Sequence, residues 1–237
     1  MKILHLFYDL MNLYGDYANV LALERTLSEK GADFETEKLS IDDSLEFLKE
    51  NSAGGYGFIY IGSGTERNQK AALEYLRQFL VPDTEAEGTP PTENLKKALN
   101  SKTVMLCTGN SFEMFGRSIT DKNGRRYDGI GLFDFETIEG SERIVADIKA
   151  DFNGNDIIGF INKSSTLEKS GIATPFFKLK QTDDSSKGAG NSDWDRENEG
   201  IISGGFYGTH IIGPLLIRNK VMAEYFADLL IQNARCS

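Results

Sequence analysis

Apolar and polar positions alternate between two periods in the first half of the chain. Four segments are predicted to be strands, namely 2–8, 34–39, 58–61 and 103–106, and the composition of 58–61 is that of a buried strand. Four others place apolar residues at helical spacing: 16–29, 42–50, 66–80 and 92–99. Because strands and helices alternate along the chain, the pattern predicts right-handed βαβ units and a mostly parallel sheet with helices on both faces.

The second half of the chain is richer in strand-like segments. Further strands are predicted at 143–152, 157–161, 176–180 and 201–207. A strongly amphipathic helix follows near the end, with Val221, Met222, Tyr225, Phe226, Leu229 and Leu230 on its apolar side. Two polar segments, 82–91 and 182–200, are expected to be loops. Neither a repeat nor a clear linker divides the sequence, so we expect one α/β domain over residues 1–237 whose second half completes the sheet.

The charge balance excludes one class of partner. The chain has 237 residues, with 26 Lys and Arg against 36 Asp and Glu, which gives a net charge of −10. A broad nucleic-acid surface needs clustered positive charge, so we expect no nucleic-acid partner. A small anionic ligand remains possible, since a single helix N-terminus can hold one.

Cysteine usage and hydropathy indicate the compartment. The two cysteines, Cys107 and Cys236, cannot form a disulfide framework, and a reducing cytoplasm is the expected location. The apolar run at 3–8 is interrupted by Asp9 and is too short to span a bilayer, so no membrane insertion is expected. No residue spacing is typical of a metal site, and no cofactor is predicted.

The segment 106–116 has the form of a strand-to-helix turn that could expose a reactive side chain. Enzymes of the α/β class place a nucleophile on such a turn, beside backbone N–H donors. Only Cys107 lies near it, and the histidines are His5 and His210. A Cys–His mechanism would therefore pair Cys107 with His210. The alternative is structural: Cys107 would be a small core residue and His210 a hydrogen-bonded one.

A second turn, Gly62-Ser63-Gly64, follows the predicted strand at 58–61. Because the next helix opens with free N–H groups, this turn could bind an anion or a carboxylate. It could equally be a tight connection without a ligand. Open α/β sheets place their sites at the carboxyl ends of the strands, so we expect Gly62–Gly64, the 107–111 turn and His210 to meet in one crevice.

Four segments resemble motifs of one enzyme family. Residues 9–19 read D-L-M-N-L-Y-G-D-Y-A-N, and residues 61–69 read I-G-S-G-T-E-R-N-Q. Residues 207–216 read Y-G-T-H-I-I-G-P-L-L, and residues 106–116 read L-C-T-G-N-S-F-E-M-F-G. Together they resemble, in the expected order, the D-L-M-N-x-Y-G-D-x-G-N, I-G-G-G-Q-D-R-E-Q, x-G-T-Y-L-H-G-P-L-L and L-A-V-C-G-G-Y-Q-L-L-G motifs. These belong to class I glutamine amidotransferases of the cobyric acid synthase and lipid II isoglutaminyl synthase type.

The resemblance implies a flavodoxin-like class I glutamine amidotransferase fold and a specific chemistry. In this family a cysteine thiolate attacks the side-chain amide of glutamine, a histidine moves the proton, and ammonia passes to a partner synthetase. The implied ligand is glutamine or a glutamate-like molecule. The implied partner is a Mur-ligase-like, ATP-dependent amidating subunit that acts on a cell-wall precursor. By resemblance, the oxyanion hole would use Gly62–Gly64 and the N–H that follows the nucleophile.

Three motifs depart from the family pattern. Without gaps, the family's cysteine falls on Gly109 and its histidine on Ile212. A third motif, G-[FY]-E-N-H, reads G-F-I-N-K at 159–163, so that Ile161 stands where the family has glutamate and Lys163 where it has histidine. Glycine and isoleucine cannot act as nucleophile and base. The ungapped alignment therefore predicts a binding or partner subunit whose Cys–His dyad is displaced or lost.

Two alternatives remain open. With two residues inserted after Gly109, Cys107-Thr108-Gly109 becomes the nucleophile turn, with the Thr108 N–H as an oxyanion donor and Asn110 close to the substrate. The chain would then be an active glutaminase with Cys107 as nucleophile and His210 as base. His210 would share a strand face with Ile212 but lie roughly 7 Å along the strand. The other alternative is a free-standing flavodoxin-like protein that binds a small ligand.

Overall fold

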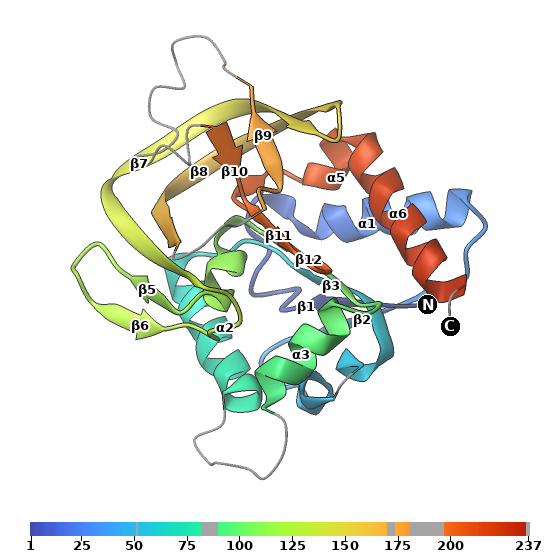
Figure 1. Ribbon diagram of the computed structural model, residues 1–237, viewed down its shortest axis with the longest axis horizontal. Coiled ribbons are helices and arrows are strands. Elements are labelled where there is room, and N and C mark those ends of the chain that lie inside the picture. Colours follow the sequence, from blue (N-terminus) through green and yellow to red (C-terminus); the bar gives the residue numbers. More distant parts are fainter. Residues whose placement is uncertain (51, 82–89, 170–173, 181–196, 236–237) are drawn as a thin grey trace.

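The computed structural model describes residues 1–50, 52–81, 90–169, 174–180 and 197–235. Within these ranges the chain forms a central sheet between two helical layers, and a second, curved sheet closes one side of the molecule (Figure 1). The N-terminus lies close to the C-terminal end of the last helix, Lys220–Arg235, in this view. Most of the predicted loop at 182–200 falls outside the described residues, as does most of the loop at 82–91, and within the described end of the 182–200 loop Asn198–Glu199 forms a short strand instead.

Among the described residues, six strands form the central sheet in the order β11-β12-β4-β3-β1-β2. Their bounds are β1 Lys2–Leu6, β2 Glu35–Leu39, β3 Tyr56–Ile61, β4 Val104–Thr108, β11 Ile201–Ser203 and β12 Phe206–Thr209. All neighbouring strands run parallel except β11, which pairs with β12 in the antiparallel sense. The predicted mostly parallel α/β sheet is thus confirmed.

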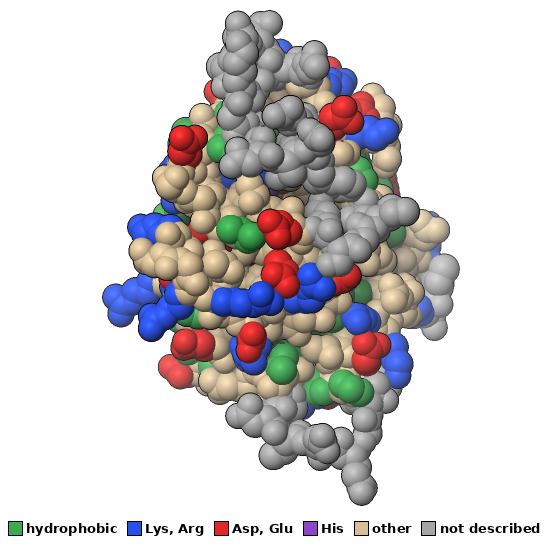
Figure 2. Space-filling model, turned by 60° about the vertical axis from the view of Figure 1, so that its left-hand side comes forward, with side chains coloured by type: hydrophobic (Ala, Val, Ile, Leu, Met, Phe, Trp, Pro, Cys, Tyr) green, Lys and Arg blue, Asp and Glu red, His purple; other side chains and the backbone are tan. Residues whose placement is uncertain are grey.

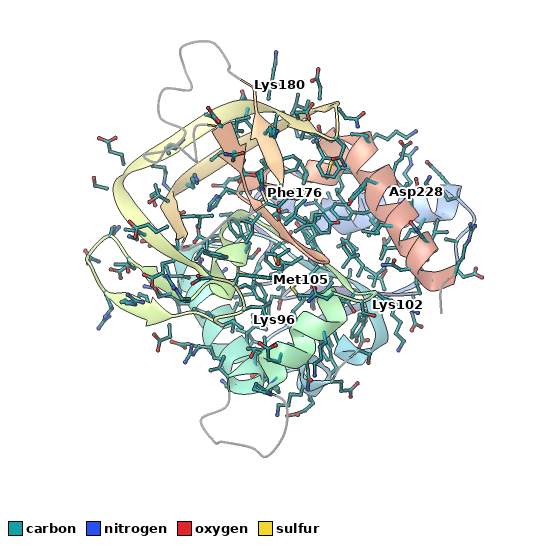
Figure 3. The ribbon with its side chains drawn as sticks, in the orientation of Figure 1. Lys96, Lys102, Met105, Phe176, Lys180 and Asp228 are labelled. Carbon is teal, nitrogen blue, oxygen red and sulfur yellow. The ribbon has the colours of Figure 1, made fainter. Side chains whose placement is uncertain are left out.

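The helices cover both faces of this sheet. Their bounds are α1 Tyr17–Glu29, α2 Glu66–Leu80, α3 Pro91–Leu99, α5 Leu215–Arg218 and α6 Lys220–Arg235. Side chains of α2 and α3 share one buried cluster with Met105 and Cys107 of β4, whereas α1 and α6 share the other with Val104 and Leu106. This division follows from the strand geometry, because alternate residues point to opposite faces. Figure 3 shows Met105 in the middle of the molecule and Asp228 at its periphery.

Local sequence explains where two helices begin or end. The Thr65 side chain accepts a hydrogen bond from the Asn68 N–H at 3.2 Å, which satisfies a free donor in the first turn of α2. Gly31, which lies two residues after the end of α1, has a φ of +68°. That conformation is inexpensive for glycine and costs a side-chain-bearing residue about 1–2 kcal/mol.

We expected the second half of the chain to complete the central sheet, and this expectation is wrong in part, because most of its strands form a second sheet. Only β11 and β12 join the central sheet. The other strands form a largely antiparallel sheet: β5 Ser118–Thr120, β6 Arg126–Asp128, β7 Phe135–Phe152, β8 Asn155–Lys169, β9 Phe177–Leu179, β10 Asn198–Glu199 and β13 Ile211–Ile212. Strands β7 and β8 form a long hairpin that curves around one side of the molecule (Figure 1). Much of β7 alternates between buried or half-buried and exposed residues, as expected of a sheet with one solvated face.

Two predicted helices are shorter or tighter than expected. The segment 42–50 contains only a 3-10 helix at Glu46–Lys49, and Asp42 just before it has a φ of +79° that no α-helix continues through. The segment after β4 is a 3-10 helix, Gly109–Phe115. Its tighter turn sets Ser111, Phe112 and Glu113 into the interior.

The surface shows no large region of a single charge on the face seen in Figure 2, where Lys and Arg side chains are interspersed with Asp and Glu. In the described segments, none of the helices combines the length and the apolar character that a bilayer crossing requires.

Candidate functional site

A cavity of about 430 Å³ lies where β3 and β4 end and the β7–β8 hairpin passes over them. Of the residues predicted for the site, Ser63, Gly64, Gly109, Asn110 and His210 line it. As far as the described residues define its wall, Gly62, Cys107 and Thr108 do not. The cavity therefore unites the two turns and the histidine without the cysteine. Its remaining lining comes largely from α2, the hairpin and the 3-10 helix after β4, and includes Glu66, Arg67, Gln69, Glu113, Glu139, Arg143, Lys163 and Ser165.

The turn after β4 has the backbone of a nucleophile turn but no room for a side chain. Gly109 has a φ of +66°, a conformation that residues with a Cβ rarely adopt. A Cβ at this position would lie 2.3 Å from the Ser63 Cβ and 3.1 Å from the Ile212 Cγ2. Two side chains thus occupy the space that a nucleophile on Gly109 would need.

Cys107 belongs to the hydrophobic core and not to the cavity wall. It points to the sheet face covered by α2 and α3 and is completely buried. Burial raises the pKa of its thiol well above the usual value, and a hydrogen bond with Ser111 offsets only part of that rise. A thiolate nucleophile requires the opposite shift.

The amides of the Gly62–Gly64 turn are used by the protein itself. The Ser63 N–H donates to Asp16 Oδ2 at 2.6 Å, and the Gly64 N–H donates to Asn110 Oδ1 at 3.0 Å. The side-chain oxygen of Asn110 thus accepts the N–H that Gly64 would have to contribute to an oxyanion hole. The bond between Gly64 and Asn110 joins the two turns at the carboxyl ends of β3 and β4.

A buried carboxyl group, that of Asp16, lies behind the Gly62–Gly64 turn. Asp16 Oδ2 also accepts a hydrogen bond from Ser63 Oγ at 2.6 Å, and Thr108 Oγ1 lies 3.4 Å away. Asp16 Oδ1 is buried and has no hydrogen-bond partner among the described residues. Burial raises the pKa of Asp16 to about 6, although the bonds from Ser63 and Thr108 favour the ionised form. Thr108 contacts Tyr60 Oη on this side, away from the cavity.

The polar centre of the cavity is His210. It sits directly after β12, and its Nε2 lies 2.8 Å from Glu113 Oε1. Glu113 also accepts bonds from Ser165 Oγ at 2.5 Å and from Gln69 Nε2 at 2.9 Å. The ring packs edge-on against Phe112, with the ring centroids 4.5 Å apart. Three elements, α2, the 3-10 helix and β8, therefore fix the histidine in one orientation.

A second carboxylate lies on the other side of His210. Glu199 of β10 accepts the His210 backbone N–H at 2.7 Å and a bond from Thr209 Oγ1, and its Oε1 lies 3.6 Å from His210 Nδ1. Burial alone would raise the pKa values of Glu113 and Glu199, but the hydrogen bond and charge of His210 outweigh it and hold both below their usual range. Both glutamates are thus carboxylates at neutral pH.

Lys163 of β8 completes this group. Its Nζ lies 3.3 Å from His210 Nδ1, and the residue is only 8% exposed. In the parts of the chain that the structure describes, no group of three or more His, Cys, Asp or Glu side chains is arranged to hold a metal ion. The cavity is therefore a site of fixed charges and hydrogen bonds.

Sequence reasoning found His210 but missed the carboxylates around it. Glu113 carried a signal, since a charged residue stood among apolar ones after the 106–110 turn. Lys163 was visible only as a departure from a motif. Glu199 carried no signal, because it ends a long polar segment and is brought to the histidine by the β9–β10 pairing.

Comparison with known proteins places this geometry in a family. The model of the CobB/CobQ-like glutamine amidotransferase domain matches residues 2–219. The GatD subunit of the lipid II isoglutaminyl synthase (glutamine-hydrolyzing) of Staphylococcus aureus is 24% identical over 230 residues, which cover 96% of this chain and 83% of the relative. The GatD subunit of Streptococcus pneumoniae is 25% identical over 227 residues, or 94% of this chain and 77% of the relative.

Two further similarities are weaker, one because it covers less of the chain and the other because the sequence identity is low. The cobyric acid synthase of Nocardia farcinica is 25% identical over 126 residues, which cover 52% of this chain and 24% of that enzyme. A crystal structure of a glutamine amidotransferase superposes with a TM-score of 0.55 at 10% identity and covers 96% of this chain and 98% of the other. That likeness shows the fold. Since the family model spans nearly the whole chain, the protein belongs to the CobB/CobQ-like glutamine amidotransferase domain family.

Proposed function

We propose that this protein is a ligand-binding partner subunit of an amidating synthase and that it does not hydrolyse glutamine. Its whole length would form one glutamine amidotransferase-like domain. The observation that carries the proposal is the turn at Gly109, where the family's cysteine is expected and a side chain would overlap Ser63. Without a nucleophile at this point the cavity can bind a ligand but cannot form the covalent intermediate.

The surroundings of the turn support the same conclusion. Cys107 is turned into the core, and burial raises the pKa of its thiol. The Gly64 N–H donates to Asn110. His210 is held between Glu113 and Glu199. The three components of the glutaminase reaction, a thiolate, a base beside it and an oxyanion donor, are thus not assembled around one point.

The subunit role rests on the two relatives whose names describe subunits of lipid II isoglutaminyl synthase. We infer a Mur-ligase-like, ATP-dependent partner for this chain as well. Exposed apolar residues provide a surface for it. Tyr17 and Leu21 are about half exposed one turn apart on α1, and Ile217 is 56% exposed on α5, which packs against α1. Exposed apolar side chains on adjacent elements are typical of interaction sites.

The decisive experiment measures the reactivity of Cys107 together with ammonia release from L-glutamine. Alkylation by iodoacetamide is followed against pH in a Cys236→Ser background, with His210 intact and with His210→Gln. We expect slow alkylation that is the same in both proteins, and no ammonia above the rate of a denatured sample. A thiol pKa below about 8.5 that rises in the His210 variant would overturn the proposal and favour the Cys107–His210 glutaminase.

Co-purification tests the subunit role separately. Tagged protein from its own cells is expected to retain a Mur-ligase-like protein, identified by mass spectrometry, and Leu21→Glu is expected to release it. Leu21 is exposed, so this change leaves the fold intact. A monomer in native lysate would contradict the subunit role and favour the free-standing small-ligand binder.

A further inference from the structure

The cavity contains a buried cation that the protein does not neutralise directly. Lys163 is more than nine-tenths buried and lines the cavity. Among the described residues, its ammonium lies within 4 Å of no carboxylate, and its polar neighbour is the His210 Nδ1 at 3.3 Å. A buried lysine without an anionic partner is unusual, because desolvating a charge costs several kcal/mol unless another group compensates.

His210 cannot satisfy this ammonium in either of its protonation states. The neutral ring offers one lone pair at Nδ1, which accepts one of three N–H groups. The protonated ring directs its N–H groups to Glu113 and toward Glu199, and so offers Lys163 no acceptor. At least two donors of Lys163 therefore remain for a group in the cavity.

The nearest buried carboxylates are already bonded. Glu113 accepts from His210, Ser165 and Gln69, and Glu199 accepts from Thr209 and from the His210 backbone. Two more cations, Arg67 and Arg143, line the cavity, and neither forms an ion pair within the described residues. Arg143 donates instead to the Asn162 side-chain oxygen at 2.7 Å. In the described parts of the chain, the wall thus carries three cations without ion-pair partners.

The acidic residues of the wall are placed differently. Glu66 of α2 and Glu139 of β7 both line the cavity, outside the group that holds His210. Burial, followed by the charge of Glu66, raises the pKa of Glu139. A ligand ammonium beside these two carboxylates would relieve their repulsion. The wall therefore offers sites for both charges of an amino acid, with additional positive charge at Lys163.

We propose that the cavity binds an acidic amino acid whose carboxylate is held by Lys163 Nζ, and that it prefers the acid to the corresponding amide. This inference rests on the proposed function, because it takes the cavity as a binding site and not as a site of hydrolysis. A carboxylate accepts the two free donors of Lys163 and supplies the missing charge. A carboxamide supplies one acceptor oxygen and no charge, and its NH₂ group would face an ammonium.

The test is calorimetric titration of the full-length protein with L-glutamate, L-glutamine and glutarate. We expect L-glutamate to bind at least tenfold more tightly than L-glutamine, and glutarate, which has no ammonium, to bind less tightly than L-glutamate. Lys163→Met is expected to weaken the binding of L-glutamate about 10- to 100-fold, as for the loss of a hydrogen bond to a charged group. Its effect on the binding of L-glutamine is expected to be much smaller. Lys163→Arg keeps the charge and is expected to retain most of the preference.

The matched control is Lys149→Met on the neighbouring strand β7, where the lysine is exposed and lies outside the cavity wall. It is expected to bind L-glutamate as the unaltered protein does. Thermal unfolding of each variant separates loss of binding from loss of folding, and Lys163→Arg carries the test if Lys163→Met does not fold. Equal affinity for acid and amide, or no binding of either acid at millimolar concentration, would overturn the inference. Ammonia release would instead contradict the proposed function, so the two failures can be distinguished.

Discussion

The turn at Gly109 and the charged group around His210 line the same cavity but are built in opposite ways. The turn keeps a backbone shape, a φ of +66°, and has no functional side chain. The charged group gathers Glu113, Glu199 and Lys163 around one imidazole, and each side chain comes from a different element. The comparison teaches that one cavity wall can combine a turn defined by its backbone with a charged group defined by its side chains.

The two regions also depend on different forces. The turn depends on close packing, because Ser63 and Ile212 fill the space beside Gly109. The charged group depends on electrostatics, because the buried carboxylates of Glu113 and Glu199 are compensated by His210 between them. Mutations that probe packing and mutations that probe charge should therefore separate the two regions.

Removing the imidazole is expected to have the largest effect on stability. His210→Ala leaves Glu113 and Glu199 buried without their shared partner, which should destabilise the protein by about 3–5 kcal/mol. Urea unfolding measures the loss. His5→Ala is the size-matched control, because His5 is equally buried and burial lowers its pKa to about 4, so that it is neutral. Equal losses in the two variants would show that the carboxylates contribute nothing.

A side chain at Gly109 is expected to have the next largest effect. Gly109→Ala combines an unfavourable positive φ with overlap against the Ser63 Cβ, so we expect a loss of about 2–4 kcal/mol. Gly124→Ala is the control: its φ is +77°, but nothing lies within 4 Å of the added Cβ. The difference between the two in urea unfolding isolates the packing contribution. If Gly109→Ala costs no more than Gly124→Ala, the space beside the turn is not closed.

Asp16, behind the Gly62–Gly64 turn, should give the stability of the protein a distinctive pH dependence. Its pKa is raised from 3.8 to about 6, so the folded state binds its proton more strongly than the unfolded state does. The resulting stability is complete below pH 3.8 and is lost as the pH rises through about 6. The loss amounts to at most about 3 kcal/mol, since one pKa unit corresponds to about 1.4 kcal/mol.

Urea midpoints measured from pH 4 to pH 7 test this dependence. Asp16→Asn, which keeps an acceptor for the Ser63 N–H, is expected to remove the decline. Glu113 in the charged group has the opposite sign: its pKa is lowered, so its contribution is present above pH 4.5 and is lost as the pH falls further. Glu113→Gln should therefore flatten only the acidic side of the profile. A profile that Asp16→Asn leaves unchanged would place the pKa of Asp16 near its ordinary value.

Cys107→Ala is expected to have the smallest effect. It removes one sulfur atom from the core, which costs about 1 kcal/mol. Affinity for L-glutamate should not change, because Cys107 is completely buried in the core and is not among the residues that line the cavity. Calorimetry checks this, and a loss of affinity greater than threefold would bring the cysteine back into the site.

Much of the fold and part of the site could be predicted from the sequence. The apolar runs at β1, β3 and β4 and the stripes of α1 and α2 are local patterns with a clear period. The position of His210 near both turns followed from parallel strands ending at one edge. Strands were predicted in the second half of the chain, but their separation into an antiparallel second sheet was not, because the pairing of strands is set by long-range contacts such as β13 with β8.

By itself the sequence determined the alternation of strands and helices in the first half of the chain, and it indicated the family. It also placed glycine at position 109 and isoleucine at position 212. Only the tertiary structure decided what fills those places. Glu113 and His210 are 97 positions apart and touch because the 3-10 helix after β4 turns inward below β12. Charges that distant carry no common pattern along the chain. Their interaction becomes strong only after folding removes them from water, and that is why the site had to be found in three dimensions.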